Sequence, residues 1–320
     1  MSTASKTNPN TTCPAVVLLF GPTAVGKTQL LADLFCGTGE IINADSMQVY
    51  RGMDIGTAKP DAQTRKQLPH HLLDVRNPDE QFNAGDFVAE ADTLVRQIHA
   101  RGLIPVISGG TAFYFRNFMY GLPNTPASDA AVRKAVRLEI DRSGLAAAYE
   151  LLQDVDPVAA ERIAKQDRYR IERALEVIRS TGRRFSDYAA STTLRSEFRM
   201  LLIGLDRPRD ELYARINQRV ELMFSQGLSD EVTELVSAGY GASDPGMQGI
   251  GYRQFQEMAS TGCRTLGDVR DAIARDSRRY AKRQLTFFRR FAETQWFHPD
   301  ELERIRDAID GFLLDGTTIT

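Results

Sequence analysis

One segment near the start of the chain carries residues that can bind phosphate. It has the spacing G-x-x-x-x-G-K-[ST] and reads Gly21-Pro22-Thr23-Ala24-Val25-Gly26-Lys27-Thr28. In such a P-loop, backbone N–H groups and a helix N-terminus converge on an anion, the lysine adds a point charge, and the hydroxyl after it can hold Mg²⁺. The loop stands between an apolar run at 15–20 and a helical pattern at 28–35, the context that the motif requires. We expect residues 21–28 to bind phosphate or pyrophosphate, with Thr28 as a ligand of Mg²⁺.

A carboxylate follows the next apolar run. Residues 40–44 predict a strand, and Asp45 comes directly after it, before Ser46, Met47 and Gln48. In an open parallel sheet, the carboxyl end of a strand beside a P-loop faces the ligand. Asp45 can therefore reach the group that lies next to the phosphates. A simpler interpretation makes Asp45 a turn cap or an outer partner of the metal, since turns often use aspartate.

Basic residues are concentrated on a few helical stretches. Arg215 and Arg219 are four residues apart, so they share one face of a predicted helix. Two longer basic runs cover residues 162–184 and 275–290. The chain has a formal net charge of −2, so a nucleic acid would have to bind to local patches such as these. Together the runs favour an RNA backbone footprint, although each could be an ordinary solvated surface.

The second basic run has two sides when it is drawn as a helix. Arg283 projects to a basic side, whereas Tyr280, Phe287 and Phe291 project to another. We expect the aromatic side to be core and not a platform on which bases stack.

The strands that must position these residues are short runs of branched apolar residues. Four of them predict buried parallel strands, and residues 70–75 give a weaker fifth. The four runs are 15–20, 40–44, 103–108 and 199–205. Helical patterns such as residues 87–100 lie between them. The predicted fold class is therefore α/β, with a parallel-sheet core like that of P-loop NTPases.

One long stretch interrupts this alternation. Residues 124–198 show helical patterns and no strand, which predicts an all-helical insertion domain. After the last strand the chain is helical again, from 208 to about 291. The core would then comprise residues 13–123 and 199–320, and residues 1–12 would form a disordered tail.

The bulk properties exclude several classes of protein. The chain has 320 residues, 42% of them hydrophobic and 26% charged, and no apolar run long enough to span a membrane. The first residues lack the pattern of a secretory signal, so we expect a cytoplasmic protein. Cys13, Cys36 and Cys263 are too scattered for a disulfide framework, and with four histidines they predict no zinc site.

Six ordered segments resemble the signatures of the bacterial tRNA dimethylallyltransferase family. The first is the P-loop, and the others are Asp45-Ser46-Met47-Gln48-Val49-Tyr50, residues 53–60, Gly109-Gly110-Thr111, residues 166–177 and residues 249–254. The resemblance extends from about residue 15 to residue 297. It implies transfer of a dimethylallyl group from dimethylallyl pyrophosphate to N6 of adenine 37 in tRNA, by a monomer. The chain lacks the C-terminal Cys/His zinc module of eukaryotic relatives, which favours the bacterial form.

The same resemblance implies roles for particular residues. The P-loop and Mg²⁺ would hold the pyrophosphate, with an arginine that we take to be Arg219 rather than Arg215. Asp45 would take or orient the N6 proton. Thr111 would lie near the reactive centre, although a helix cap explains it equally well. The tRNA would contact Thr111, Arg283, Asp45 to Gln48, and Gln166-Asp167-Arg168-Tyr169-Arg170, with the adenine extruded into a pocket shared with the isoprenoid.

Three other functions remain open from the residues. An adenylate isopentenyltransferase shares the core and the chemistry but modifies free nucleotide, which needs neither the insertion nor the basic run at 275–290. A P-loop small-molecule kinase would need a nucleobase pocket and lid arginines, which the sequence does not indicate. A nucleotide-gated binding protein would bind both substrates without turnover.

Overall fold

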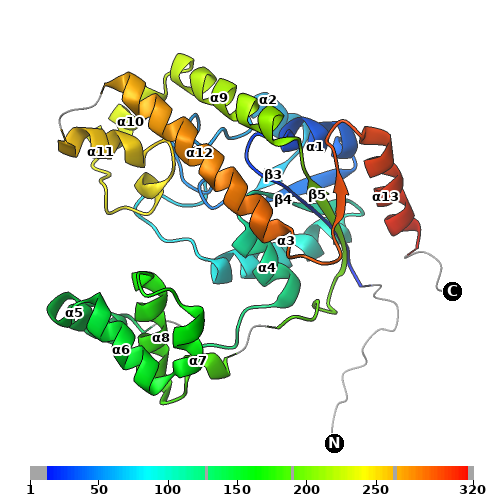
Figure 1. The fold of residues 1–320 in the computed structure, drawn as a ribbon. Coiled ribbons are helices and arrows are strands. Elements are labelled where there is room, and N and C mark those ends of the chain that lie inside the picture. Colours follow the sequence, from blue (N-terminus) through cyan, green and yellow to red (C-terminus); the bar gives the residue numbers. More distant parts are fainter. Residues whose placement is uncertain (1–12, 127–128, 189–190, 262–264, 316–320) are drawn as a thin grey trace, which may run out of the picture. The chain divides into compact units, whose positions relative to one another are not determined.

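The structure is a computed structural model, and it describes residues 13–126, 129–188, 191–261 and 265–315. The chain divides into two compact units (Figure 1). The core unit contains Met1–Phe118 and Ser196–Thr320, and the second unit contains Met119–Arg195. The tail predicted at 1–12 lies outside the described residues. Within the described ranges, no helix is both long and apolar enough to cross a membrane.

A six-stranded sheet forms the centre of the core unit, in the order β3-β2-β4-β1-β5-β6, with every pair parallel. Strand β1 lies between β4 and β5, and Leu18 is in register with Ile107 on one side and Leu202 on the other. The strands are β1 Ala15–Phe20, β2 Gly39–Asn43, β3 His70–His71, β4 Ile104–Gly109, β5 Arg199–Leu205 and β6 Gln295–Phe297. The four strong strand predictions are confirmed within one residue at each end. The fifth, at 70–75, is reduced to two residues, and β6 was not predicted.

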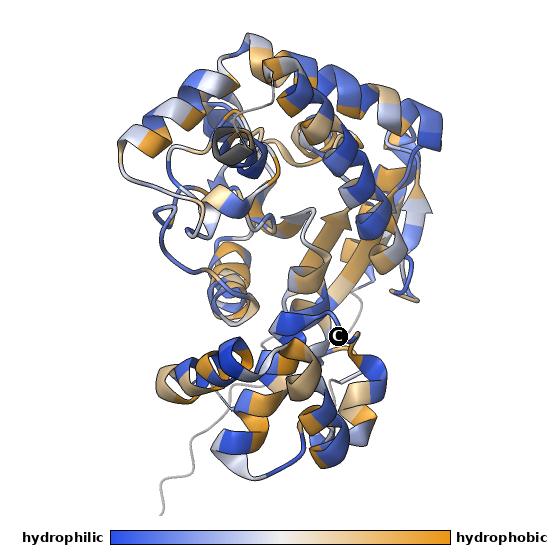
Figure 2. Ribbon diagram, turned by 60° about the vertical axis from the view of Figure 1, so that its left-hand side comes forward, coloured by the Kyte–Doolittle hydropathy of each residue, from blue (hydrophilic) through white to orange (hydrophobic). Residues whose placement is uncertain are grey.

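Helices cover both faces of this sheet, which is why the central strands β1 and β5 are long apolar runs (Figure 2). The helices of the core unit are α1 Lys27–Phe35, α2 Ala62–Gln67, α3 Ala84–Ala100, α4 Ala112–Tyr120, α9 Arg209–Ser225, α10 Leu228–Ser237, α11 Arg253–Thr261, α12 Leu266–Phe288 and α13 Leu302–Leu314. Helix α3 begins three residues before its predicted start, because Asn83 and Asp86 form a capping box there. Helix α12 packs on the end of β1 through the stacked rings of Phe20 and Phe288, whose centroids lie 4.7 Å apart.

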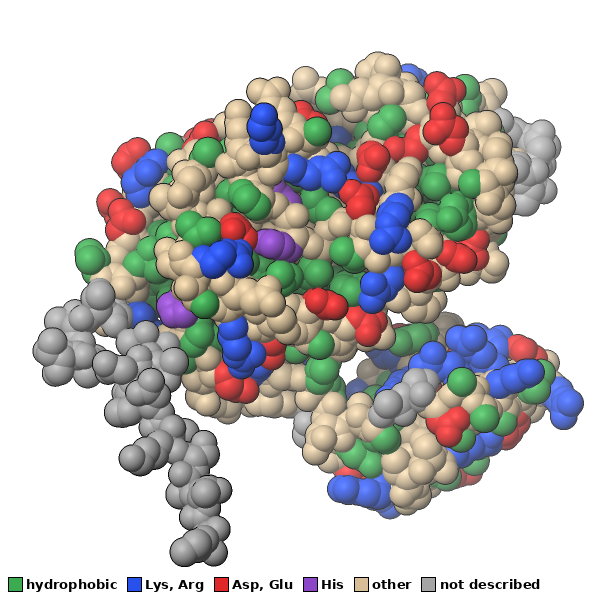
Figure 3. All heavy atoms as spheres, turned by 180° about the vertical axis from the view of Figure 1, so that it is seen from behind, with side chains coloured by type: hydrophobic (Ala, Val, Ile, Leu, Met, Phe, Trp, Pro, Cys, Tyr) green, Lys and Arg blue, Asp and Glu red, His purple; other side chains and the backbone are tan. Residues whose placement is uncertain are grey.

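The described residues of the second unit form helices and connecting loops, with no strand. It contains α5 Ala130–Ser143, α6 Leu145–Val155, α7 Pro157–Arg162, α8 Arg168–Thr181 and the short 3-10 turn Phe185–Asp187. Its small core includes Val136, Ile140, Leu152 and Ile171. Lys and Arg side chains gather on this unit on the face shown in Figure 3.

The bounds of the second unit differ from the predicted insertion of residues 124–198. The unit begins at Met119 and ends at Arg195, so residues 196–198 belong to the core. Phe198 stacks on Phe118 with ring centroids 5.4 Å apart, which holds the end of this segment on the core. The polar composition before residue 199 gave no sign of this aromatic contact.

Candidate active site

The P-loop joins β1 to α1 and is held by its own lysine. Gly26 has φ 113°, a conformation that favours glycine, and a Cβ on Gly21 would lie 2.8 Å from the carbonyl oxygen of Leu205. Lys27 Nζ donates to the carbonyl oxygens of Gly21 and Pro22, both at 2.9 Å. The two bonds leave one ammonium hydrogen for a ligand.

A cavity of about 320 Å³ opens beside the P-loop, within the core unit. Lys27, Asp45 and Arg219 give it a charged end. The same cavity has an apolar wall, formed by Ile216, Val220, Met223 and Ile273. Thr23, Ser46, Met47, Tyr280, Arg283 and Gln284 also line it. The cavity thus combines a site for an anion with room for a small apolar group.

Asp45 and Thr111 are brought together because two strands end very close to each other. A Cβ on Gly109 would lie 2.3 Å from the carbonyl group of Ala44, so only glycine allows this approach. The amide of Thr111 donates to Ala44 O at 3.0 Å, and its hydroxyl accepts from the Ser46 amide at 2.9 Å. The Thr111 hydroxyl therefore ties the turn after β4 to the loop that carries Asp45.

The charged end of the cavity holds two cations near one carboxylate. Burial lowers the pKa of Lys27 to about 8, the negative charge of Asp45 partly offsets this, and Arg219 lowers it further. Burial also lowers the pKa of Arg219, again opposed by Asp45. An anion that enters the cavity would compensate both cations, so this end suits pyrophosphate.

The structure separates the two candidate arginines of α9. Arg219 lines the cavity and donates from Nη2 to the carbonyl oxygen of Thr57 at 3.2 Å. Arg215 is exposed and donates from Nε to Ala24 O at 2.9 Å. Both arginines border the hollow at residues 24–29, which Lys27 also lines, but of the two only Arg219 also lines the cavity with Asp45.

The loop at residues 54–57, which carries Thr57, is held by a carboxylate that the sequence analysis missed. Glu231 Oε2 accepts from the amides of Asp54 at 2.8 Å and Ile55 at 2.6 Å. Its Oε1 accepts from the Gly56 amide at 3.0 Å and the Tyr252 hydroxyl at 2.6 Å. Four donors converge on one carboxylate, which fixes the backbone just before Thr57.

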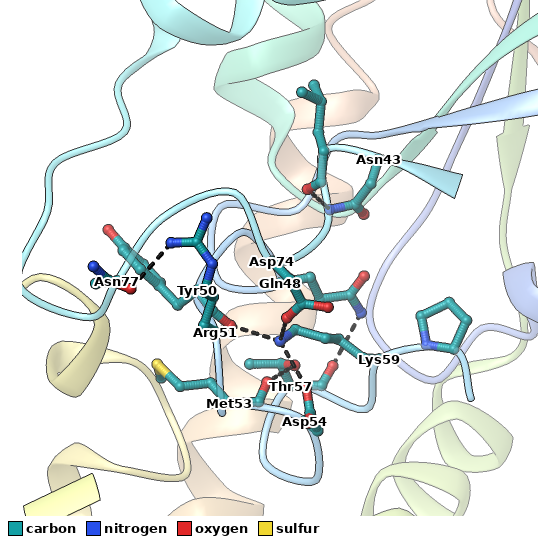
Figure 4. Close-up of polar contacts among 12 residues, drawn as sticks. Asn43, Gln48, Tyr50, Arg51, Met53, Asp54, Thr57, Lys59, Asp74 and Asn77 are labelled. Carbon is teal, nitrogen blue, oxygen red and sulfur yellow. Dashed lines mark hydrogen bonds and ion pairs between the residues drawn. The ribbon is translucent and has the colours of Figure 1, made fainter. Parts of the chain in front are cut away.

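Lys59 holds the other end of this loop. Figure 4 shows its ammonium between the Tyr50 carbonyl, Asp54 and Asp74, at 2.5, 2.7 and 2.5 Å. The amide nitrogen of Gln48 donates to the carbonyl oxygens of Thr57 at 3.1 Å and Ala58 at 3.3 Å. The side chain of Gln48 thus supports the loop from within the core, a role that its family signature did not indicate.

The remaining predicted residues of the P-loop do not line the cavity with Asp45. Thr28, Ala24 and Gly26 line a second hollow, together with Arg215 and Arg219. These three P-loop residues do not line the cavity that contains Asp45. The backbone of Pro22 binds the ammonium of Lys27. Val25 is buried.

The predicted RNA segment at 166–170 lies in the second unit, at the start of α8. Asp167 caps this helix through the amide of Arg170 and also pairs with the Arg170 side chain. Arg168 pairs with Glu172 and Asp141. Gln166 and Tyr169 are exposed, and Tyr169 keeps 69% of its surface in solvent.

One prediction about α12 is wrong in part. Phe291 is buried as expected, but Tyr280 lines the cavity, and burial raises its pKa with a contribution from Asp45. Phe287 borders an exposed hollow together with Arg283 and Arg290. A helical face drawn from the sequence cannot distinguish a core from a cavity wall, because both are apolar and enclosed.

The low pKa of Lys27 has a measurable consequence for anion binding. The ammonium loses its proton above about pH 8 in the free protein, and a bound pyrophosphate should restore the proton. We expect pyrophosphate affinity to fall as the pH rises through 8, and binding at pH 8.5 to take up a proton. Calorimetry in two buffers of different ionisation enthalpy measures this uptake. Lys27→Arg keeps its charge and supplies the baseline, so equal uptake by the parent and this variant would contradict the assignment.

The four hydrogen bonds to Glu231 should influence how well Arg219 binds an anion. In Glu231→Gln the side-chain NH₂ group would face backbone N–H donors and could not accept their hydrogen bonds. The loop at residues 54–57 should then loosen, and with it the Thr57 carbonyl to which Arg219 donates. We expect pyrophosphate affinity to fall about 10- to 100-fold, since a hydrogen bond to a charged group contributes about 1.5–3 kcal/mol. Titration by calorimetry measures it. Glu234→Gln, at an exposed position of the same helix, is the control, and equal affinities of the two variants would exclude this influence of Glu231.

Comparison with known proteins gives one consistent result. The tRNA dimethylallyltransferase of Geobacter sulfurreducens is 42% identical over 284 residues, covering 88% of this chain and 91% of that protein. The solved full-length tRNA isopentenylpyrophosphate transferase of Bacillus halodurans is 37% identical, with a TM-score of 0.68, covering 95% of this chain and 98% of that one. A solved eukaryotic dimethylallyltransferase acting on tRNA is 26% identical, with a TM-score of 0.77, over 94% of this chain and 77% of that one. Residues 48–291 match the family described as IPP transferase. The chain belongs to the IPP transferase family.

Proposed function

We propose that this chain transfers a dimethylallyl group from dimethylallyl pyrophosphate to N6 of adenine 37 in tRNA and releases pyrophosphate. The observation that carries the proposal is the cavity, which holds Lys27, Arg219, Asp45 and an apolar wall in about 320 Å³. The named activity of the curated relatives supports it, since those proteins are tRNA dimethylallyltransferases.

The P-loop would hold the pyrophosphate. Its backbone N–H groups and the start of α1 favour an anion, and Lys27 and Arg219 add two positive charges. As the bond between the allylic carbon and the bridging oxygen breaks, negative charge grows on the leaving group. Cations already fixed in the cavity stabilise that charge without rearranging, which lowers the barrier.

We propose Mg²⁺ as the accompanying metal, with the Thr28 hydroxyl as its protein ligand. Among the described residues, no group of three or more His, Cys, Asp or Glu side chains could hold a metal ion. A single hydroxyl fits an ion that is held mainly by pyrophosphate oxygens and water, as Mg²⁺ commonly is. When bound, Mg²⁺ would neutralise part of the leaving-group charge.

The apolar wall would take the dimethylallyl group and expose to the adenine its allylic CH₂ carbon, the carbon bonded to the pyrophosphate oxygen. The N6 amine attacks this carbon, so a nitrogen–carbon bond forms while the carbon–oxygen bond breaks. The nitrogen becomes positively charged and must lose a proton, which the Asp45 carboxylate would accept, as the one carboxylate among the described residues that line the cavity. Thr111 would act indirectly, because its hydroxyl holds Ser46 beside Asp45.

The RNA would contact both units. We propose that Arg283 binds backbone phosphate, since it is exposed at the cavity and shares an exposed hollow with Arg279, Lys282 and Arg290. The loop at 45–48 and the segment 166–170 would meet the anticodon stem-loop. The adenine would be extruded into the cavity, as base-modifying enzymes require. We further propose that the protein acts as a monomer in the cytoplasm.

A transfer assay tests the reaction directly. Labelled dimethylallyl pyrophosphate with Mg²⁺ is offered in parallel to unmodified tRNA and to AMP, and we expect label in tRNA alone. Label in AMP would instead identify an enzyme of free nucleotides, and label in neither acceptor would contradict the transfer reaction and favour a P-loop kinase. Asp45→Asn should lower kcat about 10²–10⁴-fold while both substrates still bind, because the general base is removed.

The basic face of α12 predicts a salt-dependent contribution to RNA binding. Arg283→Ala should weaken tRNA binding at low salt and reduce the slope of log affinity against log salt by about 1, as loss of one phosphate contact does. Filter binding at several salt concentrations measures both quantities. Arg304→Ala removes an exposed arginine of α13 and serves as the matched control. An unchanged slope in Arg283→Ala would assign the RNA to another surface.

A further inference from the structure

Gln284 of α12 connects two loops of the candidate active site through one side-chain amide. The side chain is buried, with 4% of the residue exposed. Its Oε1 accepts from the Thr23 amide at 2.9 Å, and its Nε2 donates to the carbonyl oxygen of Gly110 at 2.7 Å. Because one partner is a donor and the other an acceptor, the amide can face only one way.

The two partners of Gln284 belong to opposite sides of the proposed reaction. Thr23 lies in the P-loop, which would hold the leaving pyrophosphate. Gly110 precedes Thr111, whose hydroxyl holds the Ser46 amide next to Asp45. The side-chain amide of Gln284 therefore connects the loop that would hold the leaving group with the turn beside Asp45, where the N6 amine of adenine would lose its proton.

The contact between Gln284 and Gly110 depends on the glycine having no side chain. A Cβ on Gly110 would lie 2.4 Å from Gln284 Nε2, so the absence of a side chain is what admits the amide. Tyr280, one turn earlier on α12, points its hydroxyl at the same carbonyl from 3.5 Å. Helix α12 thus directs two polar groups at the Gly110 carbonyl.

We propose that Gln284 is a positioning residue that sets the separation between the pyrophosphate cradle and the turn that supports Asp45. The inference rests on the proposed transfer reaction. Displacement at carbon requires the attacking and leaving atoms to lie on one line through it, with the attacking atom about 3–3.5 Å away. An error of about 1 Å in such an arrangement costs about 10²-fold in rate, even when both substrates still bind.

The first test separates catalysis from binding. Gln284→Met keeps the length of the side chain and removes both hydrogen bonds, and Gln284→Glu keeps the acceptor for Thr23 but turns an oxygen toward Gly110 O. We expect kcat to fall about 10²-fold in both variants, with KM for each substrate changed less than about threefold. Gln226→Met, an exposed position at the end of α9, is the matched control. A kcat within threefold of the parent, or a loss confined to KM, would overturn the proposal.

A second test uses the contact between Gln284 and Gly110. Gly110→Ala should lower kcat because its methyl group displaces the amide. In a Gln284→Ala background the space is open, so the same change should add little further loss. Independent, multiplicative losses in the double variant would show that the two residues do not act together.

Hydrogen exchange tests the role of Gln284 separately from the proposed transfer reaction, because it needs no activity. The backbone around Thr23 and Gly110 should exchange faster in Gln284→Met than in the parent, whether or not the protein transfers dimethylallyl. A parent protein without transfer activity would refute the proposed function, while unchanged exchange would refute the link between the loops. If Gln284→Met exchanged faster but kept the kcat of the parent, the link between the loops would stand and the positioning role would be refuted.

Discussion

The close approach of Gly109 to Ala44 is the constraint on which the candidate site depends. Strands β2 and β4 are neighbours, and at their carboxyl ends the backbones come nearer than any side chain at Gly109 would allow. This places the Asp45 loop against the turn that carries Thr111. Strand β1 lies on the other side of β4, so the P-loop opens at the same edge. A parallel sheet thus gathers three distant loops, and one glycine sets how tightly two of them meet.

The positive charges at this edge of the sheet are incompletely compensated when no ligand is bound. Lys27 and Arg219 are partly buried and desolvated, and Asp45 offsets only part of this desolvation. Burial without full compensation costs folding stability, and functional sites commonly carry such a cost. The surrounding loops are correspondingly well held, since the Glu231 carboxylate accepts four hydrogen bonds and Lys59 makes three. We infer that these supports keep the charges in place until an anion compensates them.

The sequence predicted what is local and failed where contacts are distant. Strands β1 and β5 are continuous apolar runs, and the P-loop is one uninterrupted motif, so short windows were sufficient. Strand β6 has three residues at the sheet edge, and its Gln295-Trp296-Phe297 pattern fits no strand period. Glu231 and Gln284 contact residues 175 and 261 positions away, and no local pattern distinguishes them from ordinary helix residues. Tyr280 was assigned to the core because periodicity identifies an enclosed face but not a cavity.

Helix α12 explains why distant residues can act with such precision. Thr265 and Asp268 form a capping box at its start, and near its end Phe288 stacks on Phe20, the last residue of β1. The residue after Phe20 is the first glycine of the P-loop, so the helix is attached to the strand that presents the phosphate site. Gln284 is one turn from Phe288 and faces inward, whereas the next residue back, Arg283, is exposed. One rigid helix therefore carries a group that orders the cavity and a cation proposed to receive RNA, in a fixed relation to the P-loop.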